Sequence, residues 1–265
     1  MIIDFHTHCF PDNLYERAIS EISTKSKVYP SFDGSVGGLI RSMKEAGIDR
    51  CVVANIATNA KQTPKVNSFA IECSKYQELI PFGSVHPEFE DYKAEIDRLC
   101  EKHILGLKFH PHYQSYTIDD PKMMKVYEYA LSKNMVLLFH MGRDRALPDA
   151  QNATPKRMRN LVDAFNTPKI VAAHMGGEGY REEFEKYLLG TTISIDTSFA
   201  FTRMSLDDIK KILDHHNPEY ILFATDAPWA DQGDELLQYY NMNIPQKTLD
   251  LILGGNALRL LKSVK

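Results

Sequence analysis

The sequence predicts an α/β protein in which eight parallel strands close into a single (β/α)8 TIM barrel. Three observations lead to this fold: apolar runs alternate with helical patterns, eight such runs occur, and the chain has 265 residues. Strands that alternate with helices pair in parallel, and a barrel of this kind commonly occupies about 250 residues. We therefore expect one domain that spans residues 1–265.

The first half of the chain sets this alternation. The apolar run 2–6 predicts a strand, and the prolines and glycine within 9–34 predict a long loop with one short helix at 14–22. Apolar residues then recur at helical spacing and end at Gly47, a residue typical of helix C-caps. The remaining elements of this half are strands at 51–55, 80–85 and 105–110 and helices at 35–47, 64–76 and 91–102.

The second half repeats the pattern with similar spacing. Its predicted strands are 135–140, 169–174, 191–196 and 220–226. Its predicted helices are 121–133, 155–165, 182–189 and 206–215. The tail 245–261 predicts one or two further helices, interrupted at Gly254 and Gly255.

Composition excludes several classes of function. The formal net charge is −4, from 31 basic and 35 acidic residues without a long basic block, which argues against a nucleic-acid binder and favours a small-molecule partner. No apolar run approaches the roughly 18 residues that span a bilayer, so we expect no membrane association. The four cysteines form no C-x-x-C pair, which fits a reducing, cytoplasmic setting. A homodimer is the commonest assembly for such enzymes.

Ligand-type side chains gather at the ends of the predicted strands. His6 and His8 alternate along a strand, so they point to the same side. Asn55, Lys108, Asp196 and Asp226 also stand at strand ends. Seven of the ten histidines lie at or just after a strand end: His6, His8, His86, His110, His112, His140 and His174. The carboxyl ends of barrel strands meet on one face, where the catalytic residues of such enzymes are found.

Four of these side chains suit a catalytic metal. His6, His8, His140 and Asp226 would supply imidazole and carboxylate ligands to a divalent ion such as Zn²⁺, with one position left for water. A bound ion lowers the pKa of water from 15.7 towards about 7. A carboxylate or imidazole nearby can then take the proton.

Five motifs, in order, resemble the amidohydrolase superfamily: Asp4-Phe5-His6-Thr7-His8, Gly106-Leu107-Lys108-Phe109-His110-Pro111, His140, His174-Met175-Gly176-Gly177 and Thr225-Asp226-Ala227-Pro228-Trp229. The chain is most similar to the amidohydrolase-2 branch of small metal-dependent hydrolases, which includes aminocarboxymuconate semialdehyde decarboxylase. The resemblance implies that His6, His8, His140 and Asp226 hold the ion. It implies a catalytic or second-site role for His174.

The number of metals depends on Lys108. In binuclear relatives a lysine at this position is carboxylated and bridges two ions, and His174 would then bind the second. The motifs at both ends favour the mononuclear branch and therefore one Zn²⁺, with Mn²⁺ or another divalent ion as alternatives. An unmodified Lys108 would instead anchor a substrate carboxylate through its point charge.

The remaining candidates concern the substrate. His110 and His112 share the parity of Lys108 and are expected to face the pocket, although one of them could serve only as a hydrogen-bonded support. Arg143 could clamp a carboxylate, and Trp229 could form a wall of the pocket. Asp196 is expected to brace a loop rather than bind the metal.

The function predicted first is metal-dependent hydrolysis of an amide, lactone or cyclic C–N or C–O bond in a small carboxylated substrate. Asp226, with His174, would manage the proton of the attacking water. The alternative is non-oxidative decarboxylation of an aromatic or muconate-like acid, with His174 handling a proton. A third, weaker alternative is a protein whose metal serves folding and not catalysis.

Overall fold

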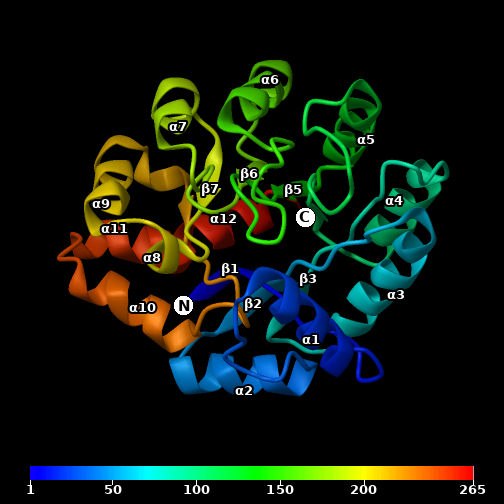
Figure 1. Cartoon of the computed structure of the whole chain (residues 1–265), viewed down its shortest axis with the longest axis horizontal. Coiled ribbons are helices and arrows are strands. Elements are labelled where there is room, and N and C mark those ends of the chain that lie inside the picture. Colours follow the sequence, from blue (N-terminus) through cyan, green and yellow to red (C-terminus); the bar gives the residue numbers. More distant parts are fainter. Residues whose placement is uncertain (265) are drawn as a thin grey trace.

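The computed structural model describes residues 1–264 of the chain. Its strands lie at the centre and helices surround them (Figure 1). The strands pair in parallel in two sheets, one of three and one of five strands. They are β1 (Ile3–Thr7), β2 (Arg50–Val53), β3 (Leu79–Pro81), β4 (Gly106–Phe109), β5 (Val136–Phe139), β6 (Ile170–Ala172), β7 (Ser194–Asp196) and β8 (Ile221–Leu222).

Single backbone bridges join the two sheets at both seams. Gly83 pairs with Leu107 between β3 and β4, and Thr7 pairs with Ala227 between β1 and β8. The strands therefore follow one another around the centre in the order of the sequence, although the ladder of hydrogen bonds is interrupted at each seam. The predicted α/β fold of the TIM-barrel type is confirmed.

Several helices begin at a residue whose side chain caps them. Ser35, Asp120, Thr154 and Ser205 each accept a hydrogen bond from a backbone N–H in the first turn of the following helix, which satisfies one orphan donor there. The helices are α1 (Tyr15–Ser26), α2 (Val36–Ala46), α3 (Thr63–Cys73), α4 (Tyr92–Glu101), α5 (Pro121–Ser132), α6 (Pro155–Phe165), α7 (Arg181–Tyr187), α8 (Ala200–Arg203), α9 (Leu206–His215), α10 (Gln232–Asn241), α11 (Gln246–Asp250) and α12 (Asn256–Lys262).

Two apolar layers form the core, because side chains alternate across each strand. On β5, Val136 and Leu138 belong to the inner cluster that fills the space between the strands. Leu137 and Phe139 belong to the outer cluster, which packs against the surrounding helices. The helix α12 also contributes to the inner cluster and contacts β1 and β8. The opposite, carboxyl ends of the strands carry the polar residues.

Two features of the last quarter differ from the prediction. The helix α10 was not predicted, although the Asp231 side chain accepts hydrogen bonds from the N–H groups of Gly233 and Asp234, which is an N-cap signal. The predicted interruption at Gly254 and Gly255 takes the form of a π-helix, Leu251–Gly255, that joins α11 to α12. Gly254 is needed there because a Cβ atom would collide with the carbonyl oxygen of Met1. Among residues 1–264, no helix has the length and apolar character needed to cross a bilayer.

Candidate active site and metal centre

An irregularity in β1 brings His6, and His8 just after the strand, into the site. The pairing of β1 with β2 shifts register between Asp4 and Thr7. Ile3 and Phe5 belong to the inner cluster, so strict alternation would turn His6 away from the interior. After the shift, His6 and His8 both line the cavity at the carboxyl ends of the strands. Bulges of this kind often re-aim side chains next to active sites.

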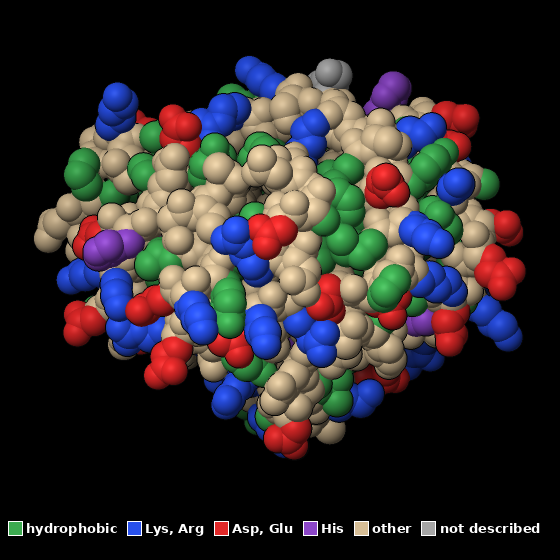
Figure 2. Space-filling view, turned by 90° about the horizontal axis from the view of Figure 1, so that it is seen from above, with side chains coloured by type: hydrophobic (Ala, Val, Ile, Leu, Met, Phe, Trp, Pro, Cys, Tyr) green, Lys and Arg blue, Asp and Glu red, His purple; other side chains and the backbone are tan. Residues whose placement is uncertain are grey.

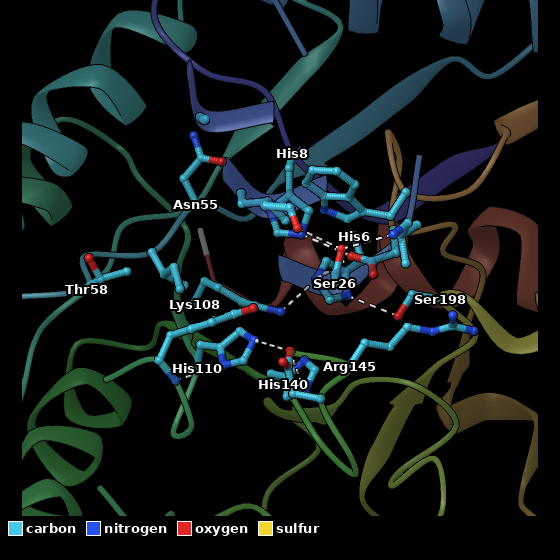
Figure 3. Close-up of a pocket in the computed structure, with 18 of the residues that line it drawn as sticks. His6, His8, Ser26, Asn55, Thr58, Lys108, His110, His140, Arg145 and Ser198 are labelled. Atoms are coloured by element: carbon cyan, nitrogen blue, oxygen red, sulfur yellow. Dashed lines mark hydrogen bonds and ion pairs between the residues drawn. The ribbon is translucent and has the colours of Figure 1, made fainter. Parts of the chain in front are cut away.

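His6, His8 and Asp226 form a compact donor cluster. Figure 3 shows His6 and His8 close to each other in the pocket. The Nε2 atom of His8 lies 3.0 Å from Oδ1 of Asp226, and Nε2 of His6 lies 3.4 Å from the same oxygen. One ligand atom from each residue lies within 4.8 Å of the others. Two imidazole nitrogens and one carboxylate oxygen are a donor set that divalent metals such as zinc take in catalytic sites. The cluster therefore fits a divalent ion.

The orientation of His6 is fixed from behind by β7. Its Nδ1 lies 2.9 Å from Oδ2 of Asp196, which makes Nδ1 the donor and leaves the Nε2 lone pair directed at the cavity. Burial lowers the pKa of His6 to about 4, and the Lys108 charge adds to this while Asp196 opposes it. Burial alone would raise the pKa of Asp196, but its interactions with His6 bring it to about 2. His6 is thus a neutral ligand, and Asp196 supports that ligand as well as its own loop.

Lys108 points from β4 towards the metal cluster (Figure 3). Its Nζ lies 2.7 Å from Nε2 of His6, and its side chain is only 1% exposed. Burial lowers the pKa of Lys108 to about 8, against the opposing charges of Asp196 and Asp226. The lysine therefore contacts the same His6 lone pair that an ion would use.

His140 and His174 form a hydrogen-bonded pair beside this cluster. Nδ1 of His174 lies 3.1 Å from the carbonyl oxygen of Ser198, so this nitrogen is the donor and Nε2 is the acceptor. Nε2 of His174 lies 3.0 Å from Nδ1 of His140, which must then donate. The Nε2 atom of His140 consequently carries a lone pair, and it is buried without a hydrogen-bond partner.

His140 does not lie in the compact cluster with His6, His8 and Asp226. It groups with His110 and His112, whose ligand atoms also lie within 4.8 Å of one another and of His140. The rings of His110 and His140 are stacked, with centroids 3.9 Å apart and an interplanar angle of 11°. Nitrogen lone pairs lie in the plane of each ring, so two stacked imidazoles cannot direct them at one ion. The first cluster is therefore the better metal site.

The other predicted site residues occupy the rim and walls. Arg143 and Trp229 both line the cavity, and the Arg143 guanidinium lies over the Tyr180 ring at 5.5 Å. His110 lines the cavity, whereas Nε2 of His112 lies 3.2 Å from the carbonyl oxygen of Ala150, as expected of a support. Sequence reasoning missed Ser198 and Asp144. Both could have been found from their positions, because Asp144 follows His140 and Ser198 follows Asp196 by a few residues.

Asp144 stands beside the stacked pair. Its Oδ2 lies 3.6 Å from Nε2 of His110 and 4.0 Å from Nε2 of His140. Burial, followed by the charges of Lys108 and neighbouring histidines, holds the pKa of His110 well below its usual value. For His140, burial and the charge of His110 have the same effect. Both rings are therefore neutral at physiological pH.

Most of these residues, though not His112 or Asp196, line one cavity of about 690 Å³. The family model described as amidohydrolase matches residues 3–262. The chain belongs to the amidohydrolase family. The family predicted from the five motifs is therefore confirmed, and with it an amidohydrolase-type, metal-dependent enzyme. Among curated proteins, no sequence matches this chain.

Solved structures share the fold of this amidohydrolase at low sequence identity. An uncharacterized TIM-barrel protein from Bordetella bronchiseptica is 16% identical, with 99% of each chain covered and a TM-score of 0.79. A 5-carboxyvanillate decarboxylase from Novosphingobium aromaticivorans, complexed with manganese, is 15% identical, with coverage of 99% and 96% and a TM-score of 0.73. The 2,6-dihydroxybenzoate decarboxylase from Rhizobium is 15% identical, with 98% of each chain covered and a TM-score of 0.70.

Proposed function

We propose that this amidohydrolase binds one divalent ion at His6, His8 and Asp226 and catalyses the non-oxidative decarboxylation of a small carboxylic acid. The observation that carries the proposal is the position of Lys108, whose Nζ lies 2.7 Å from Nε2 of His6. A metal ion at His6 would displace this ammonium from Nε2, and the two positive charges would then lie side by side at the floor of one pocket. That arrangement suits a substrate carboxylate.

The donor chemistry supports a metal at this floor. When bound, the ion would supply Lewis acidity and a fixed positive charge. His140 is proposed as the fourth ligand, and the free lone pair on its Nε2 supports this role, although its ring must turn away from His110 to use it. Zn²⁺ is our first choice for the ion and Mn²⁺ is the alternative, because a decarboxylase of the same fold carries manganese. A binuclear site would add His174 and a carboxylated Lys108.

The histidine pair supports the proton transfer that decarboxylation needs. When the bond to the carboxyl carbon breaks, carbon dioxide leaves and the electron pair stays on the remaining carbon, which must then receive a proton. Asp226 is a poor donor because, although burial alone would raise its pKa, the His6 charge and the His8 hydrogen bond hold it below its usual range. We assign the proton transfer to the His140–His174 pair, in which Nδ1 of His140 holds the shared proton and Nε2 of His174 accepts it and would pass it to the carbon.

Hydrolysis is the second candidate, and one observation favours it. The same low pKa keeps the Asp226 carboxylate ionised, so it can accept a proton from water at the site. An amide or lactone carbonyl held near Lys108 would be the target of that water. The two reactions differ in their products.

Product analysis on the metal-loaded enzyme separates them. We would incubate it with hydroxylated benzoates, including 2,6-dihydroxybenzoate and 5-carboxyvanillate, and with matched amides and lactones. Carbon dioxide release from an acid supports decarboxylation, whereas turnover confined to amides or lactones contradicts it. His6→Asn should abolish metal binding and turnover, while the exposed His103→Asn should leave both unchanged.

The kind of partner, the cellular compartment and the assembly are also proposals. A small-molecule partner is supported by the face in Figure 2, where basic and acidic side chains are intermingled without a broad basic patch. The four thiols are all free, which supports a reducing cytoplasmic compartment. A homodimer stays a prediction from the commonest assembly of such enzymes.

A further inference from the structure

The cavity extends well beyond the metal cluster. Its volume of about 690 Å³ falls within the range of roughly 300–1,000 Å³ found for sites that enclose drug-sized ligands. From His6 and Asp226 it continues outward to the helices α1 and α3. A single-ring acid held at the metal would leave much of this outer space to water.

The outer part of the cavity has apolar walls. Ala18 and Ile22 line it from α1, Val66 and Phe69 line it from α3, and Val28 also contributes. Water in contact with such walls gains little hydrogen bonding, so an apolar group there would be favoured over solvent. The histidines, Lys108 and Asp226 lie at the inner end of the pocket, and four charged residues of α1 and α3 border its outer part beside the apolar ones: Arg17, Glu21, Lys25 and Lys65.

The helix α1 packs only lightly on the rest of the molecule, with the half-buried Ile19 against Gly34. None of its residues is buried, although Ala18 and Ile22 are half-buried on the side that lines the cavity. The segment that carries it is fastened at its base, where Phe10 pairs with Ser35 and the Phe10 N–H donates to the Gly34 carbonyl at 2.8 Å. The apolar face of α1 therefore forms one wall of the cavity, on a segment anchored at both ends. A ligand bound in the cavity would cover this face.

We propose that the space between α1 and α3 binds an apolar arm of the substrate. The substrate is then a carboxylic acid whose carboxylate lies at the cluster of His6, His8 and Asp226. Its arm, an alkyl chain or a second ring, makes it longer than a single-ring acid. This rests on the proposed function only in placing the carboxylate at the inner end. A small molecule is favoured over a protein partner because the apolar space is continuous with a buried centre.

Affinity for acids of increasing length tests the proposal. Dissociation constants for butanoate and octanoate would be measured on the metal-loaded enzyme by calorimetry and by quenching of Trp229, which lines the cavity and is the single tryptophan of the sequence. Because both acids have flexible chains, the test does not depend on the exact path of the arm through the cavity. We expect octanoate to bind at least about 10-fold more tightly, which is less than the full transfer benefit of four methylene groups because the chain loses freedom.

A pair of variants on α1 locates the arm. Ile22→Asn places an amide on the cavity face and should reduce the ratio of the two dissociation constants to about 2-fold, because the amide must lose water when the chain binds. Thr24→Asn introduces the same residue at an exposed position that does not line the cavity, and it should keep the ratio. Butanoate binding to both variants checks that each is folded.

The ratio separates this proposal from the decarboxylase assignment. If the carboxylate is not anchored at the metal, both acids should bind more weakly than the proposed function implies. The ratio of their dissociation constants should nevertheless stay the same. Equal affinities for the two acids, undetectable octanoate binding, or a ratio unchanged by Ile22→Asn would overturn the proposed arm site. Carbon dioxide release, measured separately, tests the reaction.

Discussion

The carboxylate of Asp196 connects the two sides of the active site. Its Oδ2 lies 2.9 Å from Nδ1 of His6. Its Oδ1 accepts the backbone N–H groups of His174 and Ser198, each at 3.0 Å. One fully buried side chain on β7 therefore orients His6, a proposed metal ligand, and the loop after β6 that carries His174.

Replacing Asp196 should weaken metal binding without removing a ligand. In Asp196→Asn, the Nδ1 proton of His6 would face a neutral amide, so His6 becomes a weaker ligand. Loss of such a supporting carboxylate typically costs about 10- to 100-fold in metal affinity. Competition with a chromophoric chelator measures this. The exposed Asp163→Asn is the control, and an affinity within about 2-fold of wild type would refute the role given to Asp196.

Replacing Lys108 distinguishes a site with one metal ion from a site with two. Lys108→Met preserves length and removes both the ammonium and any carboxylated form. With one ion, metal content should stay at one per chain and metal affinity should rise, because the variant no longer offers a cation to Nε2 of His6. Affinity for a substrate carboxylate should fall by about 10-fold or more.

Metal analysis of wild type and Lys108→Met reports the outcome directly. A decrease from two ions to one would establish the binuclear alternative, in which Lys108 bridges. Mass spectrometry of the intact wild-type chain under native conditions would detect the added carboxyl group in that case.

The sequence predicted the position of the site but not its internal order. Strand ends could be located from apolar runs, which brought His6, His8 and Asp226 to one face as observed. The pairing of His140 with His174 and its stacking on His110 could not be predicted, because ring rotation depends on contacts with Ser198 and other loop atoms. The fold was easier because it follows from periodicity along the chain.

Loop positions explain most of the remaining differences. Asp196 was expected to brace a loop, and it does so, yet its contact with His6 requires the register shift in β1, which periodicity does not reveal. The helix α10 was missed because its first turn contains acidic residues and Gly233. The apolar residues that would reveal a helical spacing follow only after this turn. Side chains on loops depend on distant backbone, which local sequence patterns do not describe.

The loop after His140 depends on a glycine. Gly142 has a φ of +84°, and a Cβ atom there would collide with the backbone of Glu178. Gly47 has a similar φ of +72°, with open space around its Cβ position. We expect Gly47→Ala to cost about 1 kcal/mol of unfolding free energy, from the left-handed backbone alone. Gly142→Ala should cost at least about 2 kcal/mol more, because the clash is added.

Urea denaturation of the two variants measures the difference. Equal losses would show that the loop after β5 shifts to relieve the clash. If the loop does shift, Arg143 and Asp144 move with it, and a change in metal-loaded activity of Gly142→Ala but not Gly47→Ala would reveal the movement.

Glu235 makes stability depend on pH. Burial, followed by the charges of Asp4 and Asp226, raises its pKa to about 8. Between the ordinary glutamate pKa and pH 8 the folded chain therefore holds a proton that the unfolded chain has lost, so stability falls as pH rises. One such proton changes the unfolding free energy by up to about 1.4 kcal/mol per pH unit. Glu235→Gln cannot titrate, and it should remove this part of the slope.

Thermal unfolding of Glu235→Gln and wild type at pH 5 to 8 checks the sign. The variant should gain stability over wild type progressively towards pH 8, by up to about 10 °C in Tm. Asp4, whose pKa burial raises to about 7 against four hydrogen bonds, keeps a smaller slope of the same sign in both proteins. The exposed Glu45→Gln should track wild type throughout. A constant difference between Glu235→Gln and wild type across this range would mean that Glu235 does not hold its proton in the folded chain.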